Sequence, residues 1–323
     1  MSLLSLADAV TKAEAVLIAS KTAPEAARSV ATALVKAQAD GLGGHGLMRL
    51  ASYAAQTRCG KIDGFATARF TQTAPGGAII DACNGFAYPA IDLAITRLLD
   101  MTTHAGIAAI AITRSGHCGA MGLAVERLAD AGLVGIMLAN TPAAMAPWGG
   151  RRALFGTNPI ACSFPRSGKP PVVIDLSLSR VARGHVLAAK QRNEPIPLGW
   201  ALDKDGQPTN DATAALAGTM QPAGDAKGAA LALMVEALAA GLTGSHFAAE
   251  ASSFLDAEGP PSGTGQLLMA LNPAAFGPGI AHIEPLFAAI SADGNARLPG
   301  DRRLASRQLA RSAGIEVNDA WFA

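Results

Sequence analysis

The sequence predicts a mixed α/β fold, close to the α+β type, in which helices from both ends of the chain form one layer. Amphipathic helical patterns gather before residue 60 and after residue 285, and most of the short apolar runs typical of buried strands lie between them. Helices and strands do not alternate regularly, as they would in a βαβ fold. A chain of 323 residues also exceeds the size of one ordinary core. We therefore expect a helical domain from residues 1–74 and 261–323, with an α/β domain inserted at residues 75–260.

Three helices are expected near the N-terminus. Residues 6–19 and 24–40 are amphipathic, and Pro24 stands at the first position of the second helix, where a proline removes no helical hydrogen bond. Residues 47–59 form the third helix, which Gly60 ends. These helices supply the N-terminal part of the helical layer.

The rest of the chain alternates less regularly between strands and helices. The expected strands are apolar runs at residues 77–82, 106–113, 133–140, 170–177 and 265–273. The expected helices are residues 88–103, 226–243, 286–290 and 301–315. The sequence contains no internal repeat and no low-complexity linker.

The composition excludes several classes of function. The net charge is +1 without a basic stripe, so nucleic acid is not an expected partner. The longest apolar runs are too short or too rich in glycine to cross a membrane, and the N-terminus lacks the pattern of a signal peptide. The four cysteines lie far apart, which indicates free thiols and neither a disulfide framework nor a zinc site. These features predict a soluble cytoplasmic protein.

Several well-known site motifs are missing from the sequence. A Rossmann dinucleotide site needs GxGxxG between a strand and a helix, and the nearest matches, GTGQLL and GPGIAH, lack the third glycine. The six histidines form no HxH, HExxH or HxxxH motif, and no GxSxG elbow is present. A nucleotide would therefore need another kind of site, and neither a zinc hydrolase nor a serine hydrolase has local support.

The glycine-rich stretch RSGHCGAMG, residues 114–122, follows an expected strand and leads into a helix that begins near Met121. Backbone N–H groups at such a helix start can bind an anion, and the space that glycines leave would suit a pyrophosphate. Ordinary strand-to-helix turns have the same composition, so the spacing alone leaves both interpretations open.

His45 and Arg49 form the sharper candidate pair. Their i, i+4 spacing at the start of a helix puts both side chains on one side, and glycines surround the histidine. Histidine can donate a proton near neutral pH, and an arginine fork can hold a carboxylate through two hydrogen bonds. The pair would suit a small acid with a C=O or C=N bond at C2. A surface histidine beside a solvated arginine is the alternative interpretation.

Five stretches together resemble the type-2 malate/L-lactate dehydrogenase family. They are HGLMRLASYAAQTRCGKI, GHCGAMGLAVERLADAGLVGIMLANTPAAMAPWGG, LFGTNPIACSFP, VVIDLSLSRVARG and LPGDRR, in this order over nearly the whole chain. Members of the family are NAD(P)H-dependent reductases of 2-oxo acids or cyclic 2-imino acids, and they do not use a Rossmann fold. The resemblance implies an inserted cofactor-binding domain, a helical domain from both termini, and a homodimer with its site near the domain boundary.

The resemblance also implies roles for single residues. His45 matches the proton donor, and Arg49 and Thr157 match substrate-binding positions. The positions that match cofactor contacts are His117, Cys118, Gly119, Ala120, Met121, Asp175, Leu176, Ser177, Arg183, Gly184, Lys227, Arg297, Arg302 and Arg303. The implied cofactor is NADPH, with NADH as the alternative, and no metal is expected. Several of these arginines could meet a 2′-phosphate.

Two positions depart from the family pattern. Members usually carry serine immediately before the catalytic histidine, where this chain has Gly44. The cyclic-imine reductases place aspartate after the Arg-Gly of a cofactor contact, where this chain has His185. A Ser–His–Asp relay is therefore missing at both ends, and His45 should be less basic. We expect His185 to act as a second titrating group of the site, with a space-filling role as the alternative.

The leading hypothesis for function is the reduction of Δ1-pyrroline-2-carboxylate to L-proline, with Δ1-piperideine-2-carboxylate as a related substrate. It rests on the overall likeness of stretches such as GDAKGAALALMVEAL to the imine-reducing members, and on the lack of a plain second cation beside Arg49. The alternative is a 2-oxo acid or 2-hydroxy acid dehydrogenase of the malate, lactate or ureidoglycolate type. A cofactor-binding relative without turnover is a third hypothesis, against which the presence of His45 and Arg49 argues.

Overall fold

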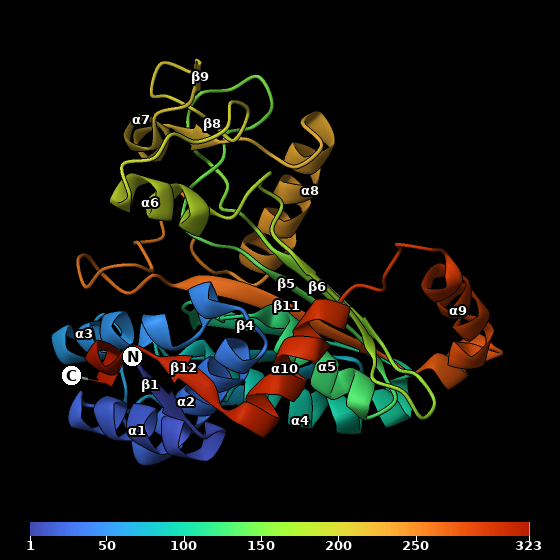
Figure 1. Cartoon of the computed structure of the whole chain (residues 1–323). Coiled ribbons are helices and arrows are strands. Elements are labelled where there is room, and N and C mark those ends of the chain that lie inside the picture. The colour runs from blue at the N-terminus through green and yellow to red at the C-terminus, as the bar shows by residue number, and fades with distance from the viewer. Residues whose placement is uncertain (323) are drawn as a thin grey trace.

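The computed structural model describes residues 1–322, and a seven-stranded sheet forms its centre (Figure 1). The strand order is β2-β3-β4-β11-β5-β6-β7. These strands are β2 (Arg69–Ala74), β3 (Gly77–Asp81), β4 (Ile107–Ser115), β5 (Val134–Ala139), β6 (Ile160–Phe164), β7 (Val172–Leu176) and β11 (Thr264–Leu271). β3 and β4 run parallel, and the other neighbours in this sheet are antiparallel. The fold is therefore mixed α/β, and its largely antiparallel sheet differs from a Rossmann sheet.

The strand register brings several loops to one end of the sheet. The pairs that show this are Thr264–Ser115, Gln266–Ala139, Leu138–Ile160 and Ile160–Leu176. The loops after β4, β5 and β7 and the loop before β6 consequently open at the same end, which we call the site end. From β4 to β7 this end spans four strand spacings, or roughly 19 Å.

Alternate side chains of β11 cover the two faces of the sheet, as the two-residue period of a strand requires. Leu268 packs in one core with α4 (Ala87–Ala105) and α5 (Met121–Asp130). Leu267 packs in the opposite core with α8 (Ala226–Glu236). The sheet is thus covered on both faces, and its loops at the site end are the parts left free to form a site.

Both ends of the chain contribute to one helical layer, in the lower part of Figure 1. Its helices are α1 (Leu6–Ala19), α2 (Pro24–Ala39), α3 (Leu50–Cys59) and α10 (Asp301–Ala313). β1 (Ser2–Leu4) pairs with β12 (Ile315–Val317), so the first and last parts of the chain are hydrogen-bonded to each other. Leu34 of α2 and Val317 are buried in the same core. This layer agrees with the expected joining of the two termini.

A smaller lobe lies above the sheet in Figure 1. It contains α6 (Arg183–Gln191), α7 (Ala212–Ala217), α8 and a three-stranded sheet of order β10-β8-β9. These short strands are β8 (Ala201–Leu202), β9 (Pro208–Thr209) and β10 (Thr219–Met220). One π-helical turn, Ala237–Gly241, extends α8.

The helix α9 (Glu284–Ala292) stands at the far edge of the sheet, at the right of Figure 1. Glu284 pairs with Arg166 and Lys169 of the β6–β7 hairpin, at 2.6 Å in each case. Phe287 packs edge-on against Phe164, with ring centroids 6.1 Å apart. Short 3-10 turns at Pro273–Phe276, Gly279–His282 and Asp319–Phe322 complete the C-terminal part.

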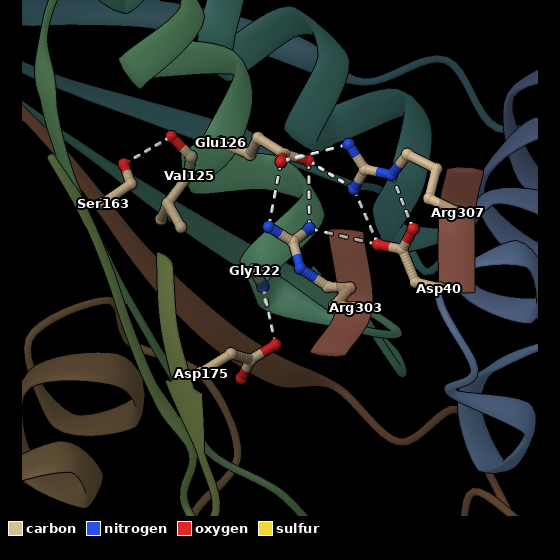
Figure 2. A network of polar contacts seen from close by, with 8 residues as sticks. All are labelled: Asp40, Gly122, Val125, Glu126, Ser163, Asp175, Arg303 and Arg307. Carbon is tan, nitrogen blue, oxygen red and sulfur yellow. Dashed lines mark hydrogen bonds and ion pairs between the residues drawn. The ribbon is translucent and has the colours of Figure 1, made fainter. Parts of the chain in front are cut away.

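Four buried charges join α10 to α2 and α5 (Figure 2). Arg307 donates to Asp40 at 2.6 and 2.7 Å and to Glu126 at 2.7 and 3.1 Å. Arg303 donates to Glu126 at 2.9 and 3.0 Å and to Asp40 at 3.1 Å. The Asp40 side chain is fully buried. We call these four residues the charge cluster; it fixes the C-terminal helix to the rest of the layer.

The structure confirms the expected α/β class and most of the expected elements. The N-terminal helices end within a residue of their expected ends, and Gly60 caps α3 with φ +82°. The prediction missed β2, which is mostly exposed and polar, and β6, a five-residue strand whose apolar run is interrupted by the buried Ser163. β11 lies at the centre of the sheet, although residues 261–323 were expected in the helical domain. The division into domains remains a prediction.

Candidate active site

Two short 3-10 turns place His45 and Arg49 at the start of α3. The turns are Gly43–His45 and Leu47–Arg49, and they replace the first part of the predicted helix because the glycines disfavour a regular α-helix. The Nε of Arg49 donates a 2.8 Å hydrogen bond to the carbonyl oxygen of Gly44. The guanidinium therefore folds back beside the histidine, and the two predicted residues lie together.

His45 is a neutral imidazole at physiological pH. Burial, followed by the nearby positive charge of Arg49, lowers its pKa from 6.5 to about 4. Among the described residues, no group forms a hydrogen bond with its buried Nδ1. The sequence predicts a less basic histidine because the relay is missing, and the structure adds burial and Arg49 as physical causes. A neutral imidazole is ready to accept a proton from a bound molecule.

His117, from the loop after β4, stacks on His45. The two ring centroids are 5.4 Å apart and the ring planes differ by 11°. The Nδ1 of His117 lies 2.5 Å from the hydroxyl of Tyr53, and the ring of Phe254 lies 5.3 Å away. Burial, then the charges of Arg49 and His45, lower the pKa of His117 well below its usual range. The structure thus brings together the predicted proton donor and the first predicted cofactor contact.

Residues 247–262, which we call the strap, cross α3 beside this histidine pair. Lys61, whose side chain is 3% exposed, donates from Nζ to the carbonyl oxygens of Ser253 at 2.7 Å and Glu258 at 2.6 Å. Gln56 donates from Nε2 to the carbonyl oxygen of Phe254 at 3.1 Å. These bonds from α3 and the residues just after it hold Phe254 against His117.

Thr157 lies at the site end, where the loop before β6 meets the loop after β5. Its backbone N–H donates to the hydroxyl of Thr141 at 2.9 Å, and its own hydroxyl lies 3.4 Å from that hydroxyl. Both threonines come from the motifs that carry the family resemblance. Their hydroxyls lie side by side where these two loops meet.

A buried carboxylate supports the same two loops. Glu236 of α8 is 4% exposed and accepts hydrogen bonds from the side-chain amides of Asn158 at 2.7 Å and Asn140 at 3.2 Å. It also accepts from the N–H of Ala248 in the strap at 2.6 Å. The asparagines of the Asn-Thr-Pro and Gly-Thr-Asn-Pro motifs are therefore structural, and they position the threonine loops and the strap relative to each other.

At the start of α5, the expected anion site shares its N–H donors with a side chain of β7. The N–H of Gly122 donates a 2.7 Å hydrogen bond to the carboxylate of Asp175 (Figure 2). One of the donors at the helix start is therefore occupied by a side chain of β7. An anion at this helix start would have to use other N–H groups.

The remaining predicted residues of this segment are mostly buried. Cys118, Ala120 and Met121 are 8%, 7% and 1% exposed. Burial, followed by the charge of Asp175, raises the pKa of the Cys118 thiol to about 12, so it is not a nucleophile at neutral pH. Gly119 has φ +68°, and a Cβ there would lie 2.5 Å from the hydroxyl of Tyr88. Backbone atoms are therefore the groups of residues 118–121 best suited to meet a ligand.

The predicted residues at the end of β7 are open to solvent. Leu176 is 46% exposed, and the hydroxyl of Ser177 lies 2.6 Å from that of Ser179. At Gly184, in the first turn of α6, a Cβ would meet no atom within 4 Å. This region leaves room for a ligand at the site end.

Two predicted cations lie between α6 and α8. Arg183 donates from Nη1 to the carbonyl oxygen of Ala143 at 3.3 Å, and its burial lowers the pKa of the guanidinium. Lys227 is exposed in the first turn of α8. Within residues 1–322, neither cation forms an ion pair, whereas the neighbouring Arg180 pairs with Asp225. Arg183 and Lys227 are thus available to an anionic ligand.

The C-terminal arginines divide into two kinds. Arg297 and Arg302 are exposed, as a phosphate contact requires. Arg303 instead belongs to the charge cluster, where two carboxylates surround a guanidinium that is 10% exposed. As a phosphate ligand, Arg303 would have to leave these partners, and its contact with the cofactor stays a prediction.

His185 does not lie in the position expected of a second titrating group. Its side chain is exposed on α6 in the smaller lobe, and its ring packs edge-on against Trp200 with centroids 6.4 Å apart. Among the described residues, no hydrogen bond or ring contact joins it to His45. The two expected roles of His185, a second titrating group or a space-filling side chain, both stay predictions.

Four functional residues were missed by the sequence reasoning. Tyr53 lies four residues after Arg49 and eight after His45, so helical spacing could have placed it on the same face. Lys61, Phe254 and Glu236 act through contacts with distant segments, for which the sequence contains no local signal.

Two further structural findings concern the described residues as a whole. None of the helices within residues 1–322 has both the length and the apolar character needed to cross a membrane. In the same part of the chain, no three His, Cys, Asp or Glu side chains gather as metal ligands.

Comparisons with known proteins agree with this architecture. A protein of Chromohalobacter salexigens named (2R)-3-sulfolactate dehydrogenase (NADP(+)) is 50% identical over 98% of this chain and 95% of its own. A Δ1-pyrroline-2-carboxylate/Δ1-piperideine-2-carboxylate reductase of Pseudomonas aeruginosa is 39% identical over 91% of this chain and 89% of its own. The crystal structure of Δ1-piperideine-2-carboxylate reductase from Pseudomonas syringae superimposes with a TM-score of 0.94 at 36% identity, covering 99% of this chain and 98% of that one.

The sequence model of one family covers almost the whole chain. The malate/L-lactate dehydrogenase model matches residues 4–323, a range that includes His45, Arg49 and the loops at the site end. The chain therefore belongs to the malate/L-lactate dehydrogenase family.

Proposed function

We propose that this oxidoreductase interconverts a 2-hydroxy acid and the corresponding 2-oxo acid with NADP(H), and that its substrate is of the 3-sulfolactate class. The sulfolactate relative shares a larger part of its sequence with this chain than the imine-reducing relative does. The relay expected of cyclic-imine reductases is missing here, because Gly44 has no side chain and His185 lies outside the histidine pair. The missing relay therefore favours the acyclic substrate.

The neutral His45 beside Arg49 carries this proposal. The guanidinium of Arg49 would hold the substrate carboxylate, and the imidazole of His45 would accept the proton of the 2-hydroxyl. NADP(H), when bound, exchanges a hydride with C2. A carboxylate on Arg49 would offset one of the two causes that lower the pKa of His45. Substrate binding would thus make the imidazole a stronger base where a base is needed.

The cofactor assignment is supported by unpaired cations at the site end. Arg183 and Lys227 would hold phosphate groups, together with the exposed Arg302 of α10. Open backbone at Ser177 and Gly184 would leave room for the rest of the nucleotide. The relative named as NADP(+)-dependent supports the choice of NADP(H) over NAD(H).

The second candidate is reduction of a cyclic 2-imino acid. It is supported by the close superposition on the piperideine-2-carboxylate reductase. In this reaction His45 would have to carry a proton, which its low pKa opposes unless the substrate changes its surroundings.

From the family resemblance we also propose that the protein is a cytoplasmic homodimer. Light scattering on the purified protein would test its oligomeric state.

A set of substrate assays tests the proposal. The appearance of NADPH, followed by its near-ultraviolet absorbance, is measured with NADP⁺ and racemic 3-sulfolactate, malate or lactate. The reverse assay uses NADPH with 3-sulfopyruvate, oxaloacetate or Δ1-pyrroline-2-carboxylate. Turnover with sulfolactate and sulfopyruvate supports the proposal. Turnover with the cyclic imine alone would replace it with the second candidate, and nucleotide binding without any turnover would indicate a binding protein.

A further inference from the structure

The two tyrosines of the chain lie in one buried row that ends on the active-site histidines. The hydroxyls of Tyr88 and Tyr53 are 3.0 Å apart, and the hydroxyl of Tyr53 is 2.5 Å from Nδ1 of His117. The tyrosines are 7% and 1% exposed. His117 in turn stacks on His45. A row of hydrogen-bonded groups therefore runs from inside the helical layer to His117, which stacks on the predicted proton donor.

The outer end of this row reaches a groove between α2, α4 and α5. The groove has a volume of about 420 Å³, and the buried residues Tyr88 and Cys118 are among those that line it. Charged side chains also line it: Arg28, Lys36, Asp92 and Arg127. Asp92 is 44% exposed and pairs with Arg127, which is 41% exposed, so this part of the groove is open to water. It is lined by none of the residues of the strap or of the smaller lobe.

The groups of the row are all neutral. Burial raises the pKa of Tyr53 to about 12 and that of Tyr88 further, and it lowers the pKa of His117. The positive charge of Arg49 lowers the pKa of all three, and the thiol of Cys118 stays protonated. With Tyr88 donating to Tyr53 and Tyr53 donating to Nδ1, the imidazole carries its proton on Nε2. The same positions also allow the opposite direction of donation, from Nδ1 of His117 to Tyr53 and from Tyr53 to Tyr88. The passage of one proton along the row therefore reverses the direction in which its hydrogen bonds donate.

We propose that Tyr88, Tyr53 and His117 form a proton path between this groove and the active site. The path rests on the proposed function, in which each oxidation releases one proton to His45. That proton passes through a water to Nε2 of His117, because parallel stacked rings cannot hydrogen-bond to each other directly. His117 gives its Nδ1 proton to Tyr53, Tyr53 gives its own to Tyr88, and Tyr88 releases one to water in the groove. Each bond to hydrogen that forms is matched by one that breaks, and no electrons move.

The need for such a path follows from what covers His45. The strap lies beside His117 on one side, and a bound substrate and cofactor would cover the open side of the imidazole. The relay that would carry the proton in related enzymes is missing at Gly44 and His185. The row through Tyr53 is the continuous set of hydrogen bonds that leads from the histidine pair to another surface.

Kinetics of Tyr53→Phe and Tyr88→Phe test the path. Each change removes one oxygen and keeps the ring, with Phe86→Leu as a control that alters the packing edge-on against Tyr53 but not the row. We expect the two variants to lose about tenfold or more in kcat, with a larger solvent deuterium isotope effect and an unchanged KM. Phe86→Leu should keep the wild-type isotope effect. Both variants keeping kcat within about twofold of wild type would overturn the proposal.

A second measurement does not depend on turnover. The hydroxyl proton of Tyr53 should give a downfield NMR signal because of its 2.5 Å hydrogen bond, and its exchange with water reports access from the groove. Tyr88→Phe should slow this exchange several-fold, whereas Phe86→Leu should not. An unchanged exchange rate in Tyr88→Phe would refute the path. If the wild-type protein turns over none of the substrates, the proposed function fails and this exchange experiment still decides on the path.

Discussion

Removing one arginine from the charge cluster should destabilise the protein strongly. Arg307 makes four hydrogen bonds of 2.6–3.1 Å to Asp40 and Glu126. In Arg307→Ala the cluster would keep two carboxylates and one guanidinium, and Asp40 would remain fully buried with a single bond to Arg303. Breaking a buried ion pair in this way costs about 3–5 kcal/mol, because the remaining charge is left without compensation.

The expected loss of unfolding free energy can be converted into a change in melting temperature. An unfolding entropy of about 2.1 cal/mol/K per residue, over 323 residues, gives about 0.7 kcal/mol per degree. Arg307→Ala should therefore lower the Tm by roughly 4–7 °C in differential scanning calorimetry at neutral pH. Arg311→Ala, an exposed arginine on the same helix, is the matched control and should shift the Tm by less than about 1 °C.

The pH dependence of this loss provides an internal check. Burial opposes ionisation of Glu126, but the bonds from Arg307 and Arg303 outweigh it and lower the pKa of this carboxyl. A carboxyl with a lowered pKa in the folded state stabilises the protein above its unfolded pKa, and this stabilisation is lost as the pH falls through the folded pKa. The difference in Tm between Arg307→Ala and the wild-type protein should thus become smaller below about pH 4. Equal Tm shifts for Arg307→Ala and Arg311→Ala at neutral pH would refute the reasoning.

Three further predictions concern the active site. With a pKa of about 4 for His45, kcat/KM for oxidation should be flat above about pH 5 and fall below pH 4, since the protonated imidazole cannot accept a proton. A pH profile of kcat/KM centred near 6.5 would contradict the burial of this residue. Arg49→Lys should raise the KM for the acid substrate about tenfold or more with a smaller change in kcat, because the point charge of an ammonium replaces the two-donor fork of the guanidinium. An unchanged KM would argue against the contact between Arg49 and the substrate carboxylate. His185→Asp should leave the pH–rate profile unmoved, because His185 packs on Trp200, and a displaced profile would return it to the site.

The fold class and the helical layer could be predicted because they depend on local patterns. The 24–40 stretch begins with a proline and the 47–59 stretch ends with a glycine, and the structure places α2 at Pro24–Ala39 and ends α3 at Cys59. The place of β11 could not be predicted in this way. Its apolar run identifies a strand, but only long-range pairing with β4 and β5 puts it at the centre of the sheet.

In the candidate site, too, the residues close together in sequence could be predicted and the contacts between distant segments could not. His45 and Arg49 are only four residues apart in sequence, and two consecutive 3-10 turns bring them together. The partners of Arg303 and Asp175 could not be predicted from the sequence. A motif identifies the residue type, whereas the partner of a charged side chain depends on which distant element lies beside it, here α2 and α5 for Arg303 and the start of α5 for Asp175.

The most direct test of the central claim compares cofactor binding and turnover in His45→Ala. The claim is that this imidazole transfers the proton of a carboxylate substrate held by Arg49, next to a bound NADP(H). Fluorescence titration should give an NADPH Kd within about threefold of wild type, while kcat falls by about 10²–10⁴-fold. Near-normal turnover in His45→Ala would contradict the account.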